Sequence, residues 1–540
     1  MKIDSTEKTR KIFSESDALS IDNAFHTFRK KVFGSKEHSP VYIVVTTILC
    51  TFLCYFYDMI YGLGCPDTLS EGVFIFRNAN YATEQARWMI RFVNQFFSRN
   101  IVIPFIVIVF YCTCIGISVY IICRMTKLFK PLTQVLLTAM MVTFPIILHH
   151  LAFYYMGLAF CLSFLLTVIG VALIRKRKIY SVILGTLCFL VMLGLYQAYV
   201  GAISALCLVL FIYDMMNEQK LSSAFKNLLL CAASGVIACL VNIPVYKLMI
   251  RLYHLDSSNR VDQFSISSIF KHLGFSLKHS YIWFFSFFKE KVLARSYLYT
   301  ILFLIILILS VSLVIILIKK KQIIRACLTI VSIIVLPLAM NLLLILIPEN
   351  GMRDMLRYQY VYIYLLLFLL HDKLPASLIN VFLKYISSFA IVLMLIGNIV
   401  TGTCTAYMYK FSYDHYKQAF LQAMSDVSKL DGYTLNETTI LTGGTPSLQE
   451  IYERNQLIFK YAAGEGGPVF YYGLFGSTTC RKSFFYDFMG IDAGDLSYDE
   501  FLNIIQSKEY KEMPLWPADG SIKMIDKIAV IKFENEPPAN

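Results

Sequence analysis

The sequence predicts an α-helical membrane protein with about eleven transmembrane helices and a small C-terminal α/β domain outside the membrane. Hydrophobic residues make up 57% of the 540 residues and charged residues only 16%, whereas soluble domains have about a quarter charged residues. The apolar residues stand in uninterrupted runs of about 20, the length that a helix needs to cross ~30 Å of hydrocarbon. A β-barrel is excluded, because its strands alternate in polarity over about 10 residues.

The apolar runs place eleven spans, give or take one. In chain order they lie near 41–62, 101–123, 131–149, 152–173, 179–199, 201–215, 227–248, 296–318, 326–347, 359–371 and 385–405. Basic clusters such as 175–178 and 319–321 follow alternate spans, and basic residues favour the cytoplasmic side. The basic residues near its end place the N-terminal tail in the cytoplasm, and an odd number of spans then puts the C-terminus on the outer side.

Three regions follow from this reading. Residues 1–40 form a cytoplasmic N-terminal tail without the apolar core of a signal peptide, so the first span is expected to act as the insertion signal. Residues 41–405 form the transmembrane domain, with long outer loops at 63–100 and 249–295. Residues 406–540 form the periplasmic α/β domain, because composition changes abruptly there and helical patterns alternate with strand-like runs at 438–442, 468–472 and 528–533.

The net charge of +13 does not indicate nucleic-acid binding. The lysines and arginines gather beside the apolar runs, where they hold topology. No Cys/His spacing is typical of a metal site. We expect no cofactor; a divalent cation is possible in principle but is not indicated, and the lipid bilayer is the first predicted partner.

The loop after the first span places an acid ahead of a basic amphipathic segment. Asp67 precedes a stretch in which Arg87 and Arg91 stand one helical turn apart, on a segment expected at the membrane surface. The acid would deprotonate an incoming hydroxyl, and the guanidinium groups would hold a lipid phosphate. An equal alternative is that Asp67 caps a turn while the arginines reach toward lipid headgroups.

Two outer turns carry polar side chains that suit a sugar or a phosphate. His149 and His150 end the third span, and Tyr196 and Gln197 end the fifth. The simpler interpretations are an interfacial His/Tyr belt and a glutamine that bonds a neighbouring helix. Arg353 and Arg357 lie in the short outer loop before the tenth span, where topology disfavours basic residues, and they form a second candidate phosphate clamp.

The pattern of these parts resembles the bacterial and phage O-antigen glucosyltransferases, the serotype-converting Gtr enzymes of the glucosyltransferase II type with a GT-C-like architecture. The resemblance covers roughly 41–535. It rests on Asp67, on Ala86-Arg87-Trp88 where the family usually shows Gly-Arg-Trp, on Tyr196-Gln197-Ala198, on the loop at 353–357 and on the ending that starts at Pro517. The family often has paired acids in the first loop, and Glu71 would supply the second carboxylate here.

The resemblance implies a polyprenyl-phosphate-sugar-dependent glycosyltransferase of the bacterial inner membrane. It would move a hexose, expected to be glucose, from undecaprenyl phosphate to an O-antigen or similar surface polysaccharide on the periplasmic face, by one inverting displacement. The lipid phosphate leaves as a stable anion, so one base suffices, unlike in a glycosidase. The alternatives are a polysaccharide polymerase that uses lipid-linked repeat units and a flippase or transporter of lipid-linked sugars; a transporter would predict matched, broken repeats.

Overall fold

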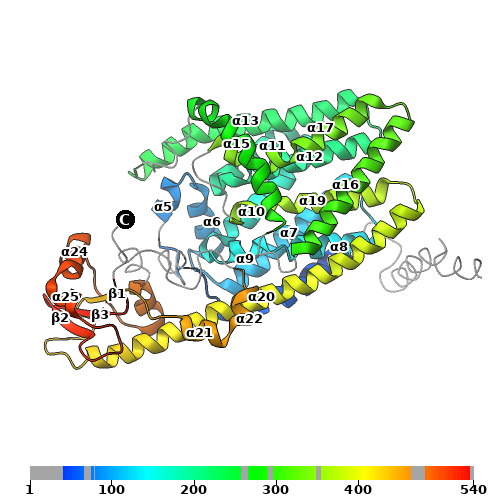
Figure 1. The fold of residues 1–540 in the computed structure, drawn as a ribbon. Coiled ribbons are helices and arrows are strands. Elements are labelled where there is room, and N and C mark those ends of the chain that lie inside the picture. The colour runs from blue at the N-terminus through cyan, green and yellow to red at the C-terminus, as the bar shows by residue number, and fades with distance from the viewer. Residues whose placement is uncertain are drawn as a thin grey trace, which may run out of the picture.

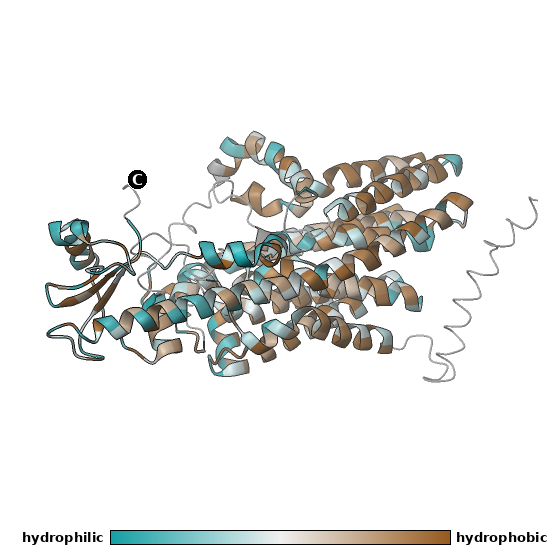
Figure 2. Ribbon diagram, turned by 60° about the horizontal axis from the view of Figure 1, so that its bottom comes forward, coloured by the Kyte–Doolittle hydropathy of each residue, from teal (hydrophilic) through white to brown (hydrophobic). Residues whose placement is uncertain are grey.

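The computed structural model describes residues 40–65, 68, 74–77, 79–256, 266–289, 296–347, 354–463 and 481–535. A bundle of long helices makes up most of the chain, and a small domain with a sheet stands at one end of it (Figure 1). Apolar residues dominate the helices of the bundle, and hydrophilic residues gather at helix ends and in the small domain (Figure 2). This distribution is that of a membrane bundle with one water-exposed domain.

The helices begin and end near the expected spans. Those of the first half are α3 (Val41–Tyr61), α5 (Ala79–Glu84), α6 (Met89–Ser98), α7 (Pro104–Thr126), α8 (Pro131–Val142), α9 (Ile146–Leu151), α10 (Tyr154–Ile174), α11 (Ile179–Leu195), η1 (Gln197–Tyr199), α12 (Val200–Met216) and α13 (Leu221–Leu252). Those of the second half of the bundle are α15 (Ile266–Phe287), α16 (Ser296–Lys319), α17 (Ile323–Met340), α18 (Leu342–Leu346), η3 (Asp354–Leu356), η4 (Tyr358–Tyr360), α19 (Val361–Lys373) and α20 (Leu378–Val427).

The described chain contains eight helices that are long and apolar enough to cross a membrane, so the predicted count of about eleven is not confirmed. The expected spans at 131–149, 179–199 and 359–371 correspond to shorter helices. α8, α11 and α19 have 12, 17 and 13 residues, or about 18, 26 and 20 Å, less than the ~30 Å of a bilayer core. α19 is buried from Val361 to Leu370. Surrounding protein can therefore satisfy the backbone beyond its ends, as a short helix inside a membrane requires.

The stretch predicted as an outer loop at 249–295 contains a further helix. α15 packs against α17 and α18. The hydroxyl of Ser276 donates to the carbonyl of Leu344 at 3.1 Å, and the amide of Asn341 donates to the carbonyl of Ser280 at 2.9 Å. Lysine and histidine residues interrupt the apolar pattern of this helix, which explains why the sequence alone favours a loop.

A single helix connects the bundle to the C-terminal domain. α20 has 50 residues, about 75 Å of helix, and Figure 1 shows it running along the bundle and out to the small domain. The expected boundary between 405 and 406 falls inside this helix. Where it passes α3, Gly402 lies so close that a Cβ atom would stand 2.4 Å from the backbone oxygen of Cys54. The absence of a side chain thus permits the close approach of the two helices.

The C-terminal domain has a three-stranded sheet in its described part, in agreement with the predicted α/β character. Strand order is β1-β3-β2, with β1 parallel and β2 antiparallel to β3, and Leu441 pairs with Val530 in the register. The side chains of Phe501 and Ile504 pack on this sheet. The elements are β1 (Ile440–Gly443), α21 (Gln449–Arg454), α22 (Gln456–Tyr461), the π-helical turn η5 (Phe485–Met489), α24 (Tyr498–Gln506), α25 (Lys508–Glu512), β2 (Ile522–Ile525) and β3 (Ile528–Lys532). The predicted strand at 468–472 lies outside the described residues.

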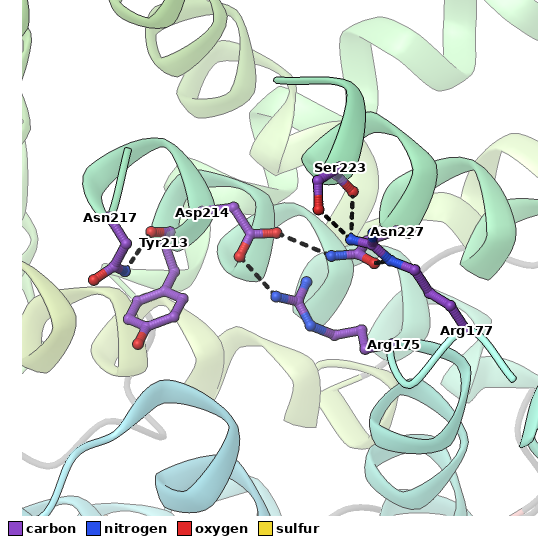
Figure 3. A network of polar contacts seen from close by, with 7 residues as sticks. All are labelled: Arg175, Arg177, Tyr213, Asp214, Asn217, Ser223 and Asn227. Carbon is purple, nitrogen blue, oxygen red and sulfur yellow. Dashed lines mark hydrogen bonds and ion pairs between the residues drawn. The ribbon is translucent and has the colours of Figure 1, made fainter. Parts of the chain in front are cut away.

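A network of polar side chains joins α10, α12 and α13 at the end of the bundle away from the C-terminal domain (Figure 3). The guanidinium of Arg175 is 2.7 Å from a carboxylate oxygen of Asp214, which is fully buried. Asn227 donates to the other oxygen at 3.4 Å and accepts from Nε of Arg177 at 2.8 Å. A buried carboxylate needs such partners, because an unpaired charge there is strongly destabilising.

Candidate active site

Several breaks between helices meet at the end of the bundle that faces the C-terminal domain. His150, in α9, connects two of them. The hydroxyl of Tyr111 in α7 lies 2.6 Å from Nδ1 of His150, and Nε2 of His150 lies 2.7 Å from the carbonyl oxygen of Met355 in η3. A carbonyl only accepts, so Nε2 carries the proton, and Tyr111 can donate to Nδ1 of a neutral ring. His150 therefore holds α7, α9 and η3 together.

A cluster of aromatic rings surrounds His150 and reaches from Tyr358 in η4 to Tyr196, just before η1. The ring of His150 stacks on Phe160 at 4.3 Å between centroids, and Tyr358 lies 5.9 Å from it. On the other side of Phe160, the ring of Tyr196 is 4.8 Å away in an edge-to-face arrangement. All these rings are buried. His149 is buried as well, at 2% exposure, so the predicted His pair belongs to the packed interior of this end of the bundle.

The turn at Ala86-Arg87-Trp88 is anchored from three sides. Nε2 of Gln197 donates to the carbonyl of Ala86 at 2.6 Å. The indole of Trp88 donates to Oδ1 of Asn242 at 2.9 Å, and its ring packs so closely on Gly194 that a Cβ there would be 2.5 Å from the indole. Ala86 has a φ of +58°, in the left-handed region. Gln197 and Trp88 thus fix the backbone that carries Arg87.

Arg87 points toward the aromatic cluster. Its guanidinium carbon lies 5.2 Å from the ring centroid of Tyr196, a cation–π distance. Its Nε is buried and has no hydrogen-bond acceptor among the described residues. Within that same part of the chain, no carboxylate is within ion-pair distance of Arg87. Arg87 therefore retains donor capacity that a phosphate or sugar oxygen can use.

Arg91 lies elsewhere, although sequence spacing placed it beside Arg87. Its guanidinium is 3.7 Å from the ring centroid of Tyr253, just beyond α13, and it donates to Asn80. The structure thus separates the predicted pair: Arg87 lies on Tyr196 and Arg91 on the far end of α13. The aromatic residues expected on one face also diverge, since Trp88, just before α6, is buried while Phe96 in α6 is 81% exposed.

The first outer loop is attached close to His149 and His150. The amide of Cys65 and the hydroxyl of Thr68 both donate to the carbonyl of Ala152, at 3.0 and 2.6 Å. The hydroxyl of Tyr413 in α20 donates to the carbonyl of Gly64 at 3.1 Å. The predicted acids Asp67 and Glu71 lie outside the described residues. The residues on both sides of the segment that contains them are nevertheless described, at Cys65 and at Phe74, as is Thr68 between the two acids.

The second predicted phosphate clamp is described only at Arg357, since Arg353 lies outside the described residues. Arg357 is 5% exposed and stands between η3 and η4. The next residues are firmly held: the hydroxyl of Tyr358 donates to the carbonyl of Met141 at 2.9 Å, and Nε2 of Gln359 donates to the carbonyl of Met340 at 2.8 Å. These bonds keep Arg357 beside the cluster around His150.

A comparison with known families decides the identity of the chain. The profile of the glucosyl transferase GtrII family matches residues 71–370, more than half of the 540 residues. The chain belongs to this glucosyl transferase family. The matched region begins at Glu71 and contains Arg87, the His pair, the Tyr196–Gln197 turn and Arg357. No curated protein and no solved structure matched the chain.

Membership of the GtrII family makes glucosyl transfer the activity class and confirms the resemblance predicted from the sequence. A sugar donor, an acceptor and a membrane are implied with it. Within the described part of this glucosyl transferase, no group of three His, Cys, Asp or Glu side chains is placed to hold a metal ion.

Two polar residues of this end of the bundle were not predicted from the sequence. Tyr111 stands in the middle of an apolar span, and such a tyrosine is itself a signal, because a buried hydroxyl needs a partner. Asp58, near the end of α3, is 5% exposed, and its Oδ2 has no hydrogen-bond partner in the described structure. An acid inside a predicted span is a functional candidate by default, and it could have been noted from sequence alone.

Proposed function

We propose that this GtrII-family protein transfers glucose from undecaprenyl phosphate to an O-antigen or similar cell-surface polysaccharide on the periplasmic face of the bacterial inner membrane. The observation that carries the proposal is that Arg87 has a buried donor without an acceptor in the described structure. Its guanidinium lies over Tyr196 with a buried Nε that lacks an acceptor in the described structure, at the end of the bundle where the helix breaks gather. A lipid-linked phosphate is an anionic partner that can reach such a group from the membrane.

The reaction is a single displacement. An acceptor hydroxyl oxygen forms a bond to the anomeric carbon while the bond from that carbon to the phosphate oxygen breaks, which inverts the configuration. The proton of the hydroxyl passes to a carboxylate, for which Asp67 and Glu71 are the candidates. Undecaprenyl phosphate leaves as an anion, and Arg87, with Arg357 and Arg353, stabilises its charge. Arg91, the His pair and Tyr196–Gln197 support the binding site.

The two ends of the bundle are held together by different kinds of contact, and this difference supports an orientation with the candidate site on the periplasmic side. The connections predicted to face the cytoplasm are joined to one another by ion pairs: Lys130–Asp372 at 3.0 Å, Arg175–Asp214 at 2.7 Å and Lys320–Glu218 at 2.8 Å. The connections predicted to face outward are joined through Ala152, His150 and Gln197. Lysine and arginine prefer the cytoplasmic side, which supports a periplasmic position for the C-terminal domain, the outer loop and Arg87.

The direct test is glucosyl transfer by the purified protein in lipid vesicles, with radiolabelled undecaprenyl-phosphate glucose and purified polysaccharide. Arg87→Ala is expected to lower kcat/KM for the lipid donor by about 100-fold or more, the usual loss for a group that stabilises charge in the transition state. Arg454→Ala is the matched control, because Arg454 is an exposed arginine of α21 that forms an exposed ion pair with Glu450. Equal activity of the two variants would remove Arg87 from the mechanism.

The acids are tested by Asp67→Asn and Glu71→Gln in the same assay, and one of them is expected to abolish transfer. Transfer that survives both changes would exclude these acids as the base. Joined repeat units in place of a single added sugar would favour the polymerase. Movement of the lipid donor across the vesicle without transfer would favour the flippase. Labelling of a cysteine at position 67 from the cytoplasmic side would contradict the orientation.

A further inference from the structure

The C-terminal domain contacts the first outer loop through a specific ion pair. The guanidinium of Arg77 lies 2.9 Å from Oδ1 of Asp487, although 410 positions separate them in sequence. The side chain of Asp487 is only 5% exposed, whereas that of Arg77 is 43% exposed. A nearly buried carboxylate therefore depends on an arginine from a distant part of the chain for its charged partner.

The segment that carries Asp487 has an unusual backbone. Residues 485–489 form the π-helical turn η5, and π-turns are rare and are frequently found at functional sites. Three successive side chains of this turn meet the outer loop or α20. Tyr486 lies 5.5 Å from the guanidinium carbon of Arg77, Asp487 pairs with it, and the ring of Phe488 is 6.0 Å from that of Phe74. This turn of the C-terminal domain thus contacts both Phe74 and Arg77 of the outer loop.

The contact continues from the loop into the bundle. The amide of Phe76 donates to the carbonyl of Asn100 at 2.8 Å, and the amide of Val102 donates to the carbonyl of Phe74 at 2.8 Å, so residues 74–76 pair with the chain just before α7. The ring of Phe76 stacks on Tyr155 at 5.5 Å, with the planes 11° apart. Tyr155 lies five residues after His150, so the docked domain, the loop and the candidate site form one packed unit.

A second link comes from α20. Tyr413 donates to the carbonyl of Gly64, at the beginning of the outer loop, and its ring is 5.2 Å from that of Phe488. The turn η5 is thus in contact with Phe74 and Arg77 directly and with Gly64 through Tyr413. The two described ends of the outer loop are held by the same turn of the C-terminal domain.

Apolar contacts alone would attach the C-terminal domain to the outer loop, so the Arg77–Asp487 ion pair is expected to have a role other than attachment. Oδ2 of Asp487 is buried and has no hydrogen-bond partner in the described structure, a costly arrangement that leucine or phenylalanine would avoid. A charge pair with one defined geometry fixes the register between two surfaces, which interchangeable apolar contacts do not. The arrangement therefore suits precise placement of the loop more than added stability.

We propose that Arg77 and Asp487 are a positioning pair, through which the C-terminal domain holds the first outer loop in the arrangement required for glucosyl transfer. The inference rests on the proposed function, because it assigns the loop to the reacting site. The domain is then a part of the catalytic unit and not a separate module for binding the acceptor. Arg77 and Asp487 act through the loop and do not touch the substrate.

The kinetic test compares Arg77→Ala and Asp487→Asn with the wild-type protein in vesicles. Misplacement of reacting groups by about 1 Å costs on the order of 100-fold, so kcat is expected to fall at least about tenfold while KM for donor and for acceptor stays within about twofold. Arg77→Lys is expected to recover part of kcat, and so is the reversed pair, Arg77→Asp with Asp487→Arg. Lys482→Ala is the control, since Lys482 forms an exposed ion pair with Asp495 in the same domain.

Hydrogen exchange measured by mass spectrometry gives a readout without activity. Asp487→Asn is expected to speed exchange in peptides that cover 74–77 and 100–102, while peptides over the strand pair 440–443 and 529–532 keep wild-type rates. Unchanged exchange at 74–77, or an unchanged kcat in Arg77→Ala, would overturn the inference, as would a rise confined to KM for the acceptor. If wild type fails to transfer glucose, the proposed function fails, and the exchange experiment still decides whether the pair holds the loop.

Discussion

The turn at Ala86 offers a sharp test of the geometry around Arg87. Ala86 has a φ of +58°, which L-residues with a Cβ adopt at a cost of about 1–2 kcal/mol. Glycine, which has no Cβ, adopts positive φ freely. The two informative substitutions are Ala86→Gly, which relieves the strain, and Ala86→Val, which increases it because a β-branched residue at positive φ is a genuine outlier.

The opposing contributions can be weighed from the structure. Glycine regains about 1–2 kcal/mol of backbone strain but loses about 0.5–1 kcal/mol through the greater freedom of the unfolded chain. It also loses about 0.8 kcal/mol from one buried methyl group, since Ala86 is 7% exposed. The net effect of Ala86→Gly is therefore within about 1 kcal/mol of zero. Valine adds two methyl groups against Tyr246 and Met89, and such overpacking costs about 1–3 kcal/mol in addition to the strain.

The assay is thermal unfolding of the protein in detergent, paired with glucosyl transfer. We expect Ala86→Gly to keep the wild-type melting temperature and activity. We expect Ala86→Val to melt several degrees lower and to lose activity about tenfold or more, because the displaced backbone carries Arg87 away from Tyr196. A valine variant that behaves like the glycine variant would refute both the left-handed conformation and the link between this turn and the site.

Two further predictions concern the stability of the bundle. Asp214→Ala leaves the guanidinium of Arg175 without its carboxylate in a mostly buried position, so the free energy of unfolding is expected to fall by about 3–5 kcal/mol, measured by thermal or denaturant unfolding. Gly402→Ala puts a methyl group 2.4 Å from the backbone oxygen of Cys54 and is expected to destabilise the protein by about 1–3 kcal/mol as α20 moves away from α3.

Each of these predictions has a matched control in the chain. The ion pair between Lys320 and Glu218 is exposed on both sides, so Glu218→Ala is expected to lower the free energy of unfolding far less than Asp214→Ala does. A Cβ at Gly235 in α13 would meet nothing within 4 Å, and Gly235→Ala is expected to be neutral or stabilising by up to about 1 kcal/mol. Equal effects of a test variant and its control would show that burial and close packing do not decide the outcome.

The membrane bundle and the small sheet were accessible from the sequence because their signals are local. A run of about 20 apolar residues predicts a span without knowledge of any partner, and most predicted spans coincide with helices. The grouping of Arg87, Tyr196, Gln197 and His150 was accessible for a related reason: alternation of the spans places all their turns at one end of the bundle. The family match over residues 71–370 confirms the family that the sequence resembled.

Other features depend on contacts that no local pattern encodes. The pair of Arg77 and Asp487 joins positions 410 residues apart, and neither residue stands in a recognisable motif. The separation of Arg91 from Arg87 follows from the competing ring of Tyr253, which lies just beyond the end of α13. α20 continues through the expected boundary at 405 because its stripe of buried residues extends to Val427; a change from apolar to amphipathic composition does not end a helix.

The polar residues at this end of the bundle form two groups. Some bond the backbone at helix breaks, and others keep a buried donor without a partner in the described structure. Where a helix ends inside protein, its last carbonyls need donors from elsewhere. Tyr358 donates to Met141 near the end of α8, and Gln359 donates to Met340 at the end of α17. These residues complete the backbone, as His150 does at Met355. The side-chain donors of these residues are thus used in hydrogen bonds to backbone carbonyls.

Arg87 is different, because its buried Nε has no such partner in the described structure. A membrane protein that breaks its helices must supply donors at the breaks, so polar character alone does not identify its active site. The informative residues are those that have a buried polar atom without a hydrogen-bond partner in the described structure, and Arg87 is the one of them whose guanidinium lies against the aromatic cluster at Tyr196. Substitution of Gln359 or Tyr358 should therefore act chiefly through stability, whereas substitution of Arg87 should act chiefly through transfer of glucose.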